Sequence, residues 1–377
     1  MIGFQVLHEE RGSAARTGRL SLPHGDVSTP AFMPVATHGS LKGLTPREID
    51  ETGAEMILSN AYHLWVRPGS KLIADLGGLH QFMGWERPIL TDSGGYQIFS
   101  LGPLVKVTDD GVSFRSYLDG SAHFLTPEDV VGIQEDLGSD IAMVLDECPP
   151  GQADVAVARA AMERTTAWAQ RAVTCRQRTD QALFGIVQGG TDVALRAESV
   201  QALVDLPFEG YAIGGLSVGE PRTETRAVAA ATAQMLPQDR PRYFMGAGTP
   251  ADLVDLVACG IDMFDCVLPT RHARNGTLFT STGAVVIRNA CHTDDSRPVD
   301  SDCDCYTCTH FSRAYLRHLA MAREPLAVTL NTMHNVTYYQ RLMRRIREAI
   351  ASDTFAALHA ALSSTTPAEE GRAPCPV

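Results

Sequence analysis

The sequence has no long apolar segment and few features of an exported protein. None of its 377 residues lies in a stretch of roughly 18 consecutive apolar residues, the length that a transmembrane helix requires. The first residues, MIGFQVLHEERG, combine neither a basic segment nor an apolar core, so they do not resemble a signal peptide. We therefore expect a cytoplasmic protein with no membrane partner.

Cysteine and positive charge are also scarce. Nine unevenly spaced cysteines are too few for a secreted disulfide framework, which favours reduced thiols and a metal site. The net charge of −12 argues against a protein that coats nucleic acid non-specifically. Residues 270–350, however, carry eleven arginines and no lysine against seven acidic residues, an excess of four positive charges. A bound polyanion is expected to contact this segment.

What is present is an ordinary globular composition, with 44% hydrophobic residues and a length that fits one large α/β barrel or two domains. Amphipathic segments such as TPREIDETGA, TPEDVVGIQEDLG and TPADLVDLVACG separate several short apolar runs. Those runs begin at Phe32, Met56, Pro88, Ile141, Leu183, Gly210, Arg242 and Met263. This alternation predicts a parallel sheet, and eight units predict a (β/α)8 barrel occupying a single domain, residues 1–377. A doubly wound open sheet is the alternative.

The alternation ends after the run at Met263. LFTSTGAVVIRN predicts a β-hairpin, which is followed by a cysteine cluster and two helical patterns, FSRAYLRHLAMARE and NVTYYQRLMRRIREAI. We expect residues 278–340 to form an insertion near the C-terminal end of the barrel. Residues 363–377 are rich in Pro, Ser and Thr and are expected to form a mobile tail.

Three cysteines, Cys303, Cys305 and Cys308, lie within six residues, a spacing that lets one turn direct all three thiols at one ion. Zinc prefers four such ligands in a tetrahedron, so a structural zinc site is expected. The alternative is a set of ordinary thiols. The candidates for the fourth ligand are His310, His318, His334, Cys291 and His292.

Carboxylates follow three of the apolar runs: Asp92, Asp146 and Asp265. A partly buried carboxylate at a barrel mouth destabilises the fold unless it is paired, hydrogen-bonded or needed for catalysis. One of the three can therefore act as a covalent nucleophile. Each alone can also be a helix N-cap or the partner of a buried arginine. Glycine-rich turns at 93–95, 188–190, 214–215 and 246–248 let the main chain approach a flat ligand, although glycine is common in plain turns.

Arg271 and Arg274 follow Asp265 and can hold phosphodiesters on either side of a reacting sugar, or they can be solvated surface residues.

Together these stretches closely resemble the bacterial tRNA-guanine transglycosylases. The resemblance spans residues 4–350, and its most specific motifs are PILTDSGGYQ, YLDG, GSDIAMVLDECPP, FGIVQGG, YAIGGLSVGE, GIDMFDCVLPTRHARNG, the cysteine cluster and TMHN. It implies a TIM barrel with a zinc-binding insertion. It also implies exchange of the wobble guanine of a GUN anticodon for a 7-deazaguanine, through a covalent link between an aspartate and the ribose.

The resemblance assigns a role to each motif residue. Asp265 is implied as the nucleophile and Asp92 as the general acid/base. Around the edge of the base it implies Asp146, Gln188, Ser93 and the Gly215 amide. It implies that Tyr96 and Met245 stack on the two faces of the base. Glu220 and the peptide after Leu216 are implied to recognise an aminomethyl group on the base. For the tRNA it implies Arg271 and Arg274, and for zinc Cys303, Cys305, Cys308 and His334.

Val218 and Cys148 match the bacterial pattern, which implies 7-aminomethyl-7-deazaguanine (preQ1) as the incoming base. Eukaryotic relatives that accept queuine have Gly in place of Val218. Gly190 and Ser217 depart from the commoner Ser and Ala, and we expect little effect. The implied partners are tRNAs for Asp, Asn, His and Tyr and a second copy of the chain. One alternative is a heterodimer that inserts queuine, which Val218 disfavours. The other is a non-catalytic RNA-binding subunit, which the presence of both Asp92 and Asp265 disfavours.

Overall fold

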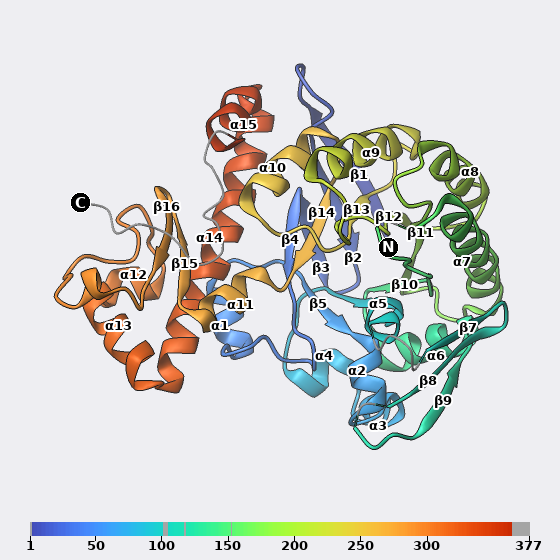
Figure 1. Cartoon of the computed structure of the whole chain (residues 1–377), viewed down its shortest axis with the longest axis horizontal. Coiled ribbons are helices and arrows are strands. Elements are labelled where there is room, and N and C mark those ends of the chain that lie inside the picture. Colours follow the sequence, from blue (N-terminus) through green and yellow to red (C-terminus); the bar gives the residue numbers. More distant parts are fainter. Residues whose placement is uncertain (1, 101–104, 117, 152, 364–377) are drawn as a thin grey trace.

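Eight parallel strands form a closed barrel at the centre of the computed structural model, which describes residues 2–100, 105–116, 118–151 and 153–363 (Figure 1). The strands are β4 (Ala31–Pro34), β5 (Ile57–Asn60), β6 (Ile89–Asp92), β10 (Ile141–Met143), β11 (Ala182–Val187), β12 (Gly210–Ile213), β13 (Arg242–Phe244) and β14 (Met263–Cys266). They pair in chain order, and β14 pairs with β4. A parallel bridge from Val35 to Leu58 joins β4 to β5 and closes the ring. The predicted (β/α)8 barrel is therefore confirmed, and the open sheet is excluded.

The barrel strands are short, and most of their residues are buried on both faces of the sheet. Every residue of β11 and β12 is buried, and so are the first two residues of β14. A strand that is covered by helices on one side and by the barrel interior on the other needs apolar residues at consecutive positions. This is why each strand appears in the sequence as a short continuous apolar run.

Helices surround the barrel, and several begin where Thr-Pro predicts. Thr45 and Thr126 form capping boxes at α1 (Pro46–Glu51) and α6 (Pro127–Leu137), and Thr249 caps α10 (Pro250–Ala258). These caps satisfy amide groups that have no partner within the helix. The other helices around the barrel are α2 (Ala61–Val66), α3 (Ser70–Asp75), α4 (Gly78–Met83), α5 (Gly95–Phe99), α7 (Val155–Cys175), α8 (Val193–Val204), α9 (Arg222–Met235) and α11 (Leu268–Asn275).

Two small antiparallel sheets have no counterpart in the sequence-based prediction. One contains β1 (Gly3–Glu9), β2 (Arg16–Leu22) and β3 (Gly25–Thr29). The other contains β7 (Lys106–Thr108), β8 (Gly111–Arg115) and β9 (Ala122–Leu125). The exposure of β1 alternates along the strand, so it has no continuous apolar run to reveal it. Strands of this kind are harder to recognise than the barrel strands.

The chain beyond β14 forms a C-terminal lobe beside the barrel (Figure 1). It contains the predicted hairpin of β15 (Thr277–Thr280) and β16 (Gly283–Val286), then α12 (Tyr306–His310), α13 (Arg313–Ala322) and the first part of α14 (Pro325–Ala351). Helix α15 (Phe355–Ser363) packs against the barrel core instead. The lobe has a hydrophobic cluster of its own. Residues near the end of α14, including Leu342 and Ile346, belong instead to the barrel core. Helix α14 therefore ties the lobe to the barrel.

Helix α14 begins at Pro325, earlier than the sequence pattern indicates, so His334 lies inside the helix rather than at its start. Pro325 occupies the first turn, where a missing amide hydrogen is tolerated. The predicted tail, residues 363–377, lies outside the described residues apart from Ser363, which ends α15. Within the described part of the chain, no helix is both long and apolar enough to cross a membrane.

Candidate active site and metal centre

Three carboxylates lie at the C-terminal ends of barrel strands. Asp92 ends β6, Asp265 lies near the end of β14, and Asp146 follows β10. Because all eight strands are parallel, these ends meet at one edge of the barrel. Tyr243, on β13 beside Asp265, is 1% exposed; burial raises its pKa well above the usual value, and the charges of Asp265 and Asp92 raise it further. Asp92 and Asp265 therefore face the same mouth.

Asp92 is buried and accepts hydrogen bonds from Asn60, Ala61 and Gln97. Asn60 Nδ2 donates to its Oδ2 at 2.5 Å, and the Ala61 amide donates to its Oδ1 at 3.0 Å. Burial is the largest influence on its pKa and raises it, the hydrogen bonds lower it, and the net result is a pKa of about 6. A carboxyl group with such a pKa can give or take a proton near neutral pH. Asn60 ends β5, the strand next to β6.

Asp265 is held by two donors that converge on one oxygen. The Tyr243 hydroxyl donates to Oδ1 at 2.6 Å and the Gly246 amide donates to the same atom at 2.9 Å. Burial raises the pKa of Asp265, while these two donors favour the ionised form. The sequence analysis missed Tyr243, because a tyrosine inside an apolar run is typical of a core position.

Asp146 and Gln188, which follow β10 and β11, form a buried hydrogen-bonded pair at the same edge of the barrel. Gln188 Nε2 donates to Asp146 Oδ2 at 2.7 Å, and Ser93 Oγ donates to Asp146 Oδ1 at 3.4 Å. Burial raises the pKa of Asp146 to about 6. Gln188 Oε1 is buried and has no hydrogen-bond partner among the described residues. An unsatisfied acceptor beside a carboxylate is suited to a ligand with several donors on one edge.

Glycines make room for these polar groups. A Cβ atom at Gly95 would lie 2.7 Å from Asp146 Oδ1, and one at Gly215 would lie 2.2 Å from Gln188 Oε1. The Gly215 amide contacts the thiol of Cys148, whose pKa burial raises to about 12, so the thiol is neutral. Any larger residue at these two glycines would fill the space beside Asp146 and Gln188.

The two predicted stacking residues lie at the same edge of the barrel. Tyr96 is on α5, which follows β6, and it is 62% exposed. Met245 directly follows β13 and is half-buried. An exposed aromatic ring at the mouth of a barrel presents a face on which a flat ligand can stack.

Glu220 organises the loop after β12. Its carboxylate accepts hydrogen bonds from the Ser217 amide, from the Val218 amide at 3.1 Å and from Thr225 Oγ1 at 2.6 Å. Burial raises the pKa of Glu220, but these hydrogen bonds outweigh burial and the net pKa is lowered. Ser217 adopts a left-handed conformation with φ of 60°. The Ser217 amide belongs to the peptide after Leu216, so the Leu216 carbonyl points away from Glu220.

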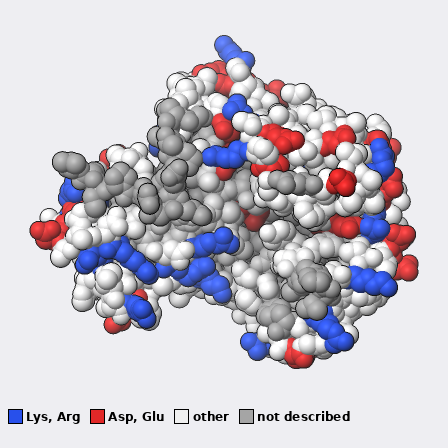
Figure 2. All heavy atoms as spheres, in the orientation of Figure 1, with Lys and Arg blue, Asp and Glu red and all other residues white. Residues whose placement is uncertain are grey.

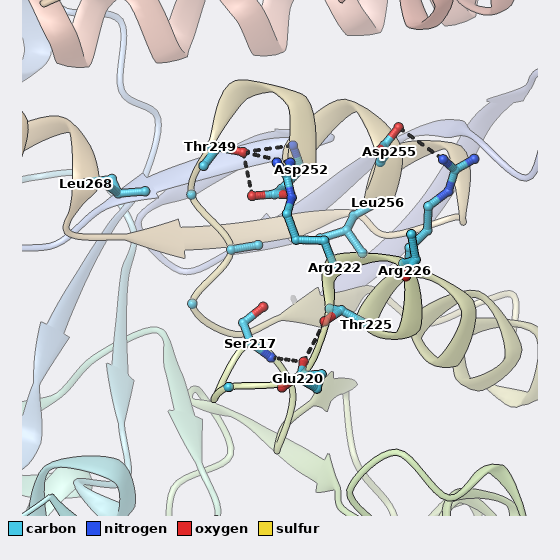
Figure 3. A pocket seen from close by; sticks show the side chains of 15 residues that line it. Ser217, Glu220, Arg222, Thr225, Arg226, Thr249, Asp252, Asp255, Leu256 and Leu268 are labelled. Carbon is cyan, nitrogen blue, oxygen red and sulfur yellow. Dashed lines mark hydrogen bonds and ion pairs between the residues drawn. The ribbon is translucent and has the colours of Figure 1, made fainter. Parts of the chain in front are cut away.

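A pocket of about 370 Å³ lies beside this loop, between the first turns of α9 and α10 (Figure 3). Ser217 and Glu220 line one side of it, and Thr249 and Asp252 line the other. Figure 3 shows Arg222 extending across it from α9, and its guanidinium pairs with Asp252. The pocket opens beside Gly246, whose amide holds Asp265.

Arg271 and Arg274 are both exposed on α11, directly after Asp265. Arg274 donates to the Thr270 carbonyl at 3.0 Å, and burial and the charge of Arg271 both lower its pKa. Figure 2 shows basic side chains gathered on the C-terminal lobe, bordering a hollow between the lobe and the barrel. This arrangement gives the mouth a positively charged rim on one side.

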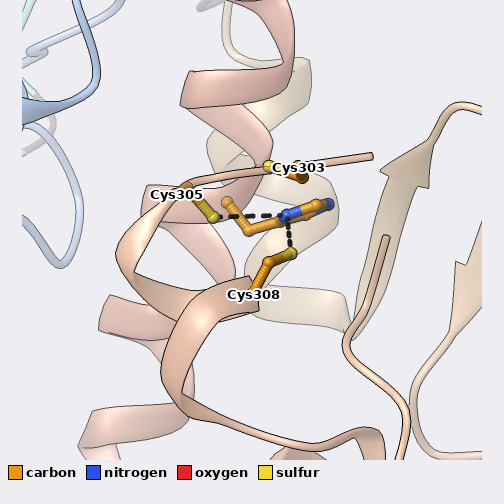
Figure 4. Close-up of side chains that lie close together, drawn as sticks. Cys303, Cys305 and Cys308 are labelled. Carbon is orange, nitrogen blue, oxygen red and sulfur yellow. Dashed lines mark hydrogen bonds between the residues drawn. The ribbon is translucent and has the colours of Figure 1, made fainter. Parts of the chain in front are cut away.

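Cys303, Cys305, Cys308 and His334 form a buried group whose ligand atoms all lie within 4.8 Å of one another. His334 Nδ1 lies 3.2 Å from Cys308 Sγ and 3.7 Å from Cys305 Sγ, and Figure 4 shows the three cysteines turned toward one centre. A zinc tetrahedron has edges of about 3.5 to 3.8 Å between such ligands. His334 Nε2 lies 2.7 Å from the Phe279 carbonyl, which fixes the tautomer that leaves Nδ1 free for a metal. The donor set therefore fits a closed, four-ligand metal site.

A second group, His24, His80 and Asp140, contains metal-ligand types but has the wrong geometry. The two rings stack with centroids 3.5 Å apart and planes only 15° from parallel. A ligated ion must lie near the plane of each ring, and two nearly parallel planes at this separation share no such point. The rings instead bond to different oxygens of Asp140, at 2.9 and 3.0 Å. This cluster joins the β2–β3 turn to α4 and β10.

Known proteins resemble this chain over nearly its whole length. A model of the family described as queuine tRNA-ribosyltransferase matches residues 11–368. The queuine tRNA-ribosyltransferase of Caldanaerobacter subterraneus subsp. tengcongensis is 55% identical over 353 residues, which cover 93% of this chain and 94% of the relative. That of Desulfosudis oleivorans is 55% identical over 386 residues, covering 100% of this chain and 99% of the relative. The chain therefore belongs to the queuine tRNA-ribosyltransferase family, the pentosyltransferases known as tRNA-guanine transglycosylases.

Proposed function

We propose that this protein exchanges the wobble guanine of GUN anticodons for 7-aminomethyl-7-deazaguanine through a covalent intermediate on Asp265. The observation that carries the proposal is the placement of two carboxyl groups, the buried Asp92 and the half-buried Asp265, at the same edge of one barrel, with the bonded pair of Asp146 and Gln188 at that edge too. A glycosidic bond can be broken and remade with retention when one carboxylate attacks and another group moves the proton.

Two displacements make up the proposed reaction. In the first, the ionised Asp265 bonds to the anomeric carbon of the ribose, the bond from that carbon to guanine N9 breaks, and Asp92 supplies the proton that leaves with the base. In the second, Asp92 takes the N9 proton of the incoming base, which bonds to the same carbon while the ester bond to Asp265 breaks. The Tyr243 and Gly246 donors stabilise the carboxylate that is released.

The pocket residues account for base selection in this proposal. Asp146 accepts from the donors on the pyrimidine edge of the base, Gln188 and the Gly215 amide contact its oxygen and ring edge, and Ser93 supports Asp146. Tyr96 and Met245 cover the two faces of the ring. The Leu216 carbonyl, turned away from Glu220, is available to the aminomethyl group, and Val218 and Cys148 limit the size of the 7-substituent.

The remaining parts of the proposal concern the partners. Arg271 and Arg274 contact the anticodon-loop backbone of tRNAs for Asp, Asn, His and Tyr, since phosphates attract such exposed arginines. Zinc is held by Cys303, Cys305, Cys308 and His334, and it links α12 to α14 and stabilises the lobe. The protein works in the cytoplasm as a homodimer.

The pKa of Asp92 predicts how the first displacement depends on pH. Asp92 must carry a proton when guanine leaves, and its pKa is about 6. We expect the single-turnover rate of adduct formation to fall as pH rises above about 6, approaching tenfold per pH unit. An Asp92→Asn variant is expected to form the adduct slowly, and its rate is not expected to fall as pH rises above about 6. A wild-type rate that does not change between pH 6 and 8 would contradict the assignment.

Val218 sets the size limit in this proposal. Because Val218 is half-buried in the loop that Glu220 organises, Val218→Gly removes bulk without removing a hydrogen-bonding side chain. We expect the KM for queuine to fall by about tenfold or more, with little change in the KM for 7-aminomethyl-7-deazaguanine. Val218→Ala serves as the intermediate control, and equal responses to both bases would exclude Val218 as the selector.

Mass spectrometry of an anticodon fragment tests the proposed function. Unmodified tRNA is incubated with the purified protein and either 7-aminomethyl-7-deazaguanine or queuine. The proposal predicts incorporation of the aminomethyl base at the wobble position and little incorporation of queuine. Preferred incorporation of queuine supports the eukaryote-like alternative, and tRNA binding without exchange supports the RNA-binding subunit.

A further inference from the structure

Arg196 is a buried cation that the proposed reaction leaves unexplained. It lies on α8 and is 0% exposed, although arginine is rarely buried without a carboxylate partner. Its three hydrogen bonds all go to main-chain carbonyl oxygens: Gly190 at 2.7 Å, Gly214 at 2.9 Å and Val187 at 3.5 Å. Burial lowers its pKa to about 10, so the guanidinium still keeps its charge at neutral pH. The sequence analysis missed it, because an arginine in an amphipathic helix is typical of an exposed position.

These carbonyls belong to the two segments that carry Gln188 and Gly215, which the proposed function assigns to the base. Val187 and Gly190 flank Gln188, whose side chain bonds to Asp146. Gly214 precedes Gly215, whose amide contacts the Cys148 thiol. Arg196 therefore joins the ends of β11 and β12, and its side chain does not need to touch the base.

The geometry of a peptide bond gives this contact a direction. In a trans peptide the carbonyl and the amide hydrogen point in opposite directions. The bond from Arg196 Nη2 to the Gly214 carbonyl therefore turns the Gly215 amide away from the guanidinium and toward the side on which the Cys148 thiol lies. A peptide between two glycines rotates at little cost, and Gly215 already has a φ of 65°. Without a partner for the carbonyl, this peptide is held only by the contact of its amide with the Cys148 thiol, whose sulfur is a weak acceptor.

We propose that Arg196 is a positioning residue that locks the Gly214–Gly215 peptide with its amide facing the base, so that this amide selects bases with a carbonyl oxygen at the purine 6-position. The inference rests on the proposed function. If the peptide turned over, it would present a carbonyl oxygen to the carbonyl of the base, and two acceptors repel each other. Arg196 thus acts on the base through the main chain.

The test compares guanine with 6-thioguanine, which keeps the ring donors and replaces the oxygen by sulfur, a weaker acceptor. Inhibition constants for both bases are measured in the exchange reaction on tRNA. We expect wild type to prefer guanine, and Arg196→Lys, which keeps the charge but loses the planar fork, to reduce that preference by about fivefold or more. Arg196→Gln is expected to reduce it similarly, and it carries the test if the lysine variant does not fold.

Arg242 provides a matched control at the opposite end of the barrel. It is 6% exposed, and its guanidinium bonds to the Gly260 and Leu236 carbonyls at 3.3 and 3.1 Å. Arg242→Lys is expected to lower the melting temperature to a similar degree and to leave the base preference unchanged. An unchanged preference in the Arg196 variants, or an equal loss in Arg242→Lys, would overturn the inference. Failure of wild type to exchange guanine at all would instead contradict the proposed function.

Discussion

Replacing Asp265 with asparagine is expected to abolish base exchange while the protein stays folded and still binds tRNA. The asparagine amide keeps an Oδ1 that can accept from the Tyr243 hydroxyl and the Gly246 amide, so the local hydrogen bonds survive. What it loses is a carboxylate able to bond to a sugar carbon. We expect the exchange rate to fall by about 10⁴-fold or more, measured with radiolabelled guanine and unmodified tRNA.

Two controls accompany this variant. The melting temperature and the affinity for tRNA are expected to stay close to those of wild type, which separates lost chemistry from lost structure. Asp239→Asn, at an exposed position before β13, is expected to exchange guanine at the wild-type rate. Exchange by Asp265→Asn at more than about a tenth of the wild-type rate would remove Asp265 from its proposed role.

Replacing Cys305 with alanine is expected to release the metal and destabilise the C-terminal lobe. Cys305 is buried at the N-cap position of α12, and its Sγ lies 3.7 Å from His334 Nδ1. Its replacement removes one ligand from the only group of four metal-ligand side chains among the described residues. A metal present at about a thousand times its dissociation constant contributes about 4 kcal/mol to stability. We expect the bound zinc, measured by plasma emission spectrometry, to fall below one tenth of an equivalent, and the melting temperature to fall by about 5 °C.

Cys175 offers the matched control, because it is a free, half-buried cysteine at the end of α7 and far along the chain from the metal ligands. Cys175→Ala is expected to keep a full equivalent of zinc and to melt close to wild type. A chelator is expected to reproduce the effect of Cys305→Ala on wild type and to have little further effect on that variant. A zinc-free wild type with unchanged stability would contradict the structural role.

The sequence was most informative where burial is complete. Barrel strands such as β11 are covered on both faces, so each appears as a continuous apolar run, and all eight were predicted. Strand β1 is exposed at every second residue and lacks such a run, so its sheet was missed. The amphipathic segments that begin with Thr45-Pro46 and Thr126-Pro127 do start helices there, because the threonine caps depend on local hydrogen bonds alone.

The candidate site was predictable only in part from the residues themselves. Spacing brought three cysteines together but left five candidates for the fourth ligand, because the helical residue that completes the group is distant in the sequence. The structure places His334 there. Strand-end position indicated Asp92, Asp146 and Asp265 as a group, and only the resemblance divided the roles among them.

Residues that act from behind the site gave no local signal. Tyr243 has the pattern of a core residue and Arg196 that of an exposed helical residue, yet both bond to groups at the barrel mouth. The groups to which they bond lie far from them in the sequence, so no repeating pattern of residues reveals these contacts. Such residues become visible only when the strand ends are placed side by side.

The central claim is that Asp265 becomes bonded to the ribose, and peptide mapping of the trapped protein tests it most directly. Wild-type protein is incubated with tRNA in the absence of a second base, denatured, digested with protease and nuclease, and analysed by tandem mass spectrometry. The account predicts a ribose attached to the peptide that contains Asp265, and no such adduct in Asp265→Asn. A ribose found on Asp92, or exchange that proceeds with no adduct on any residue, would contradict it.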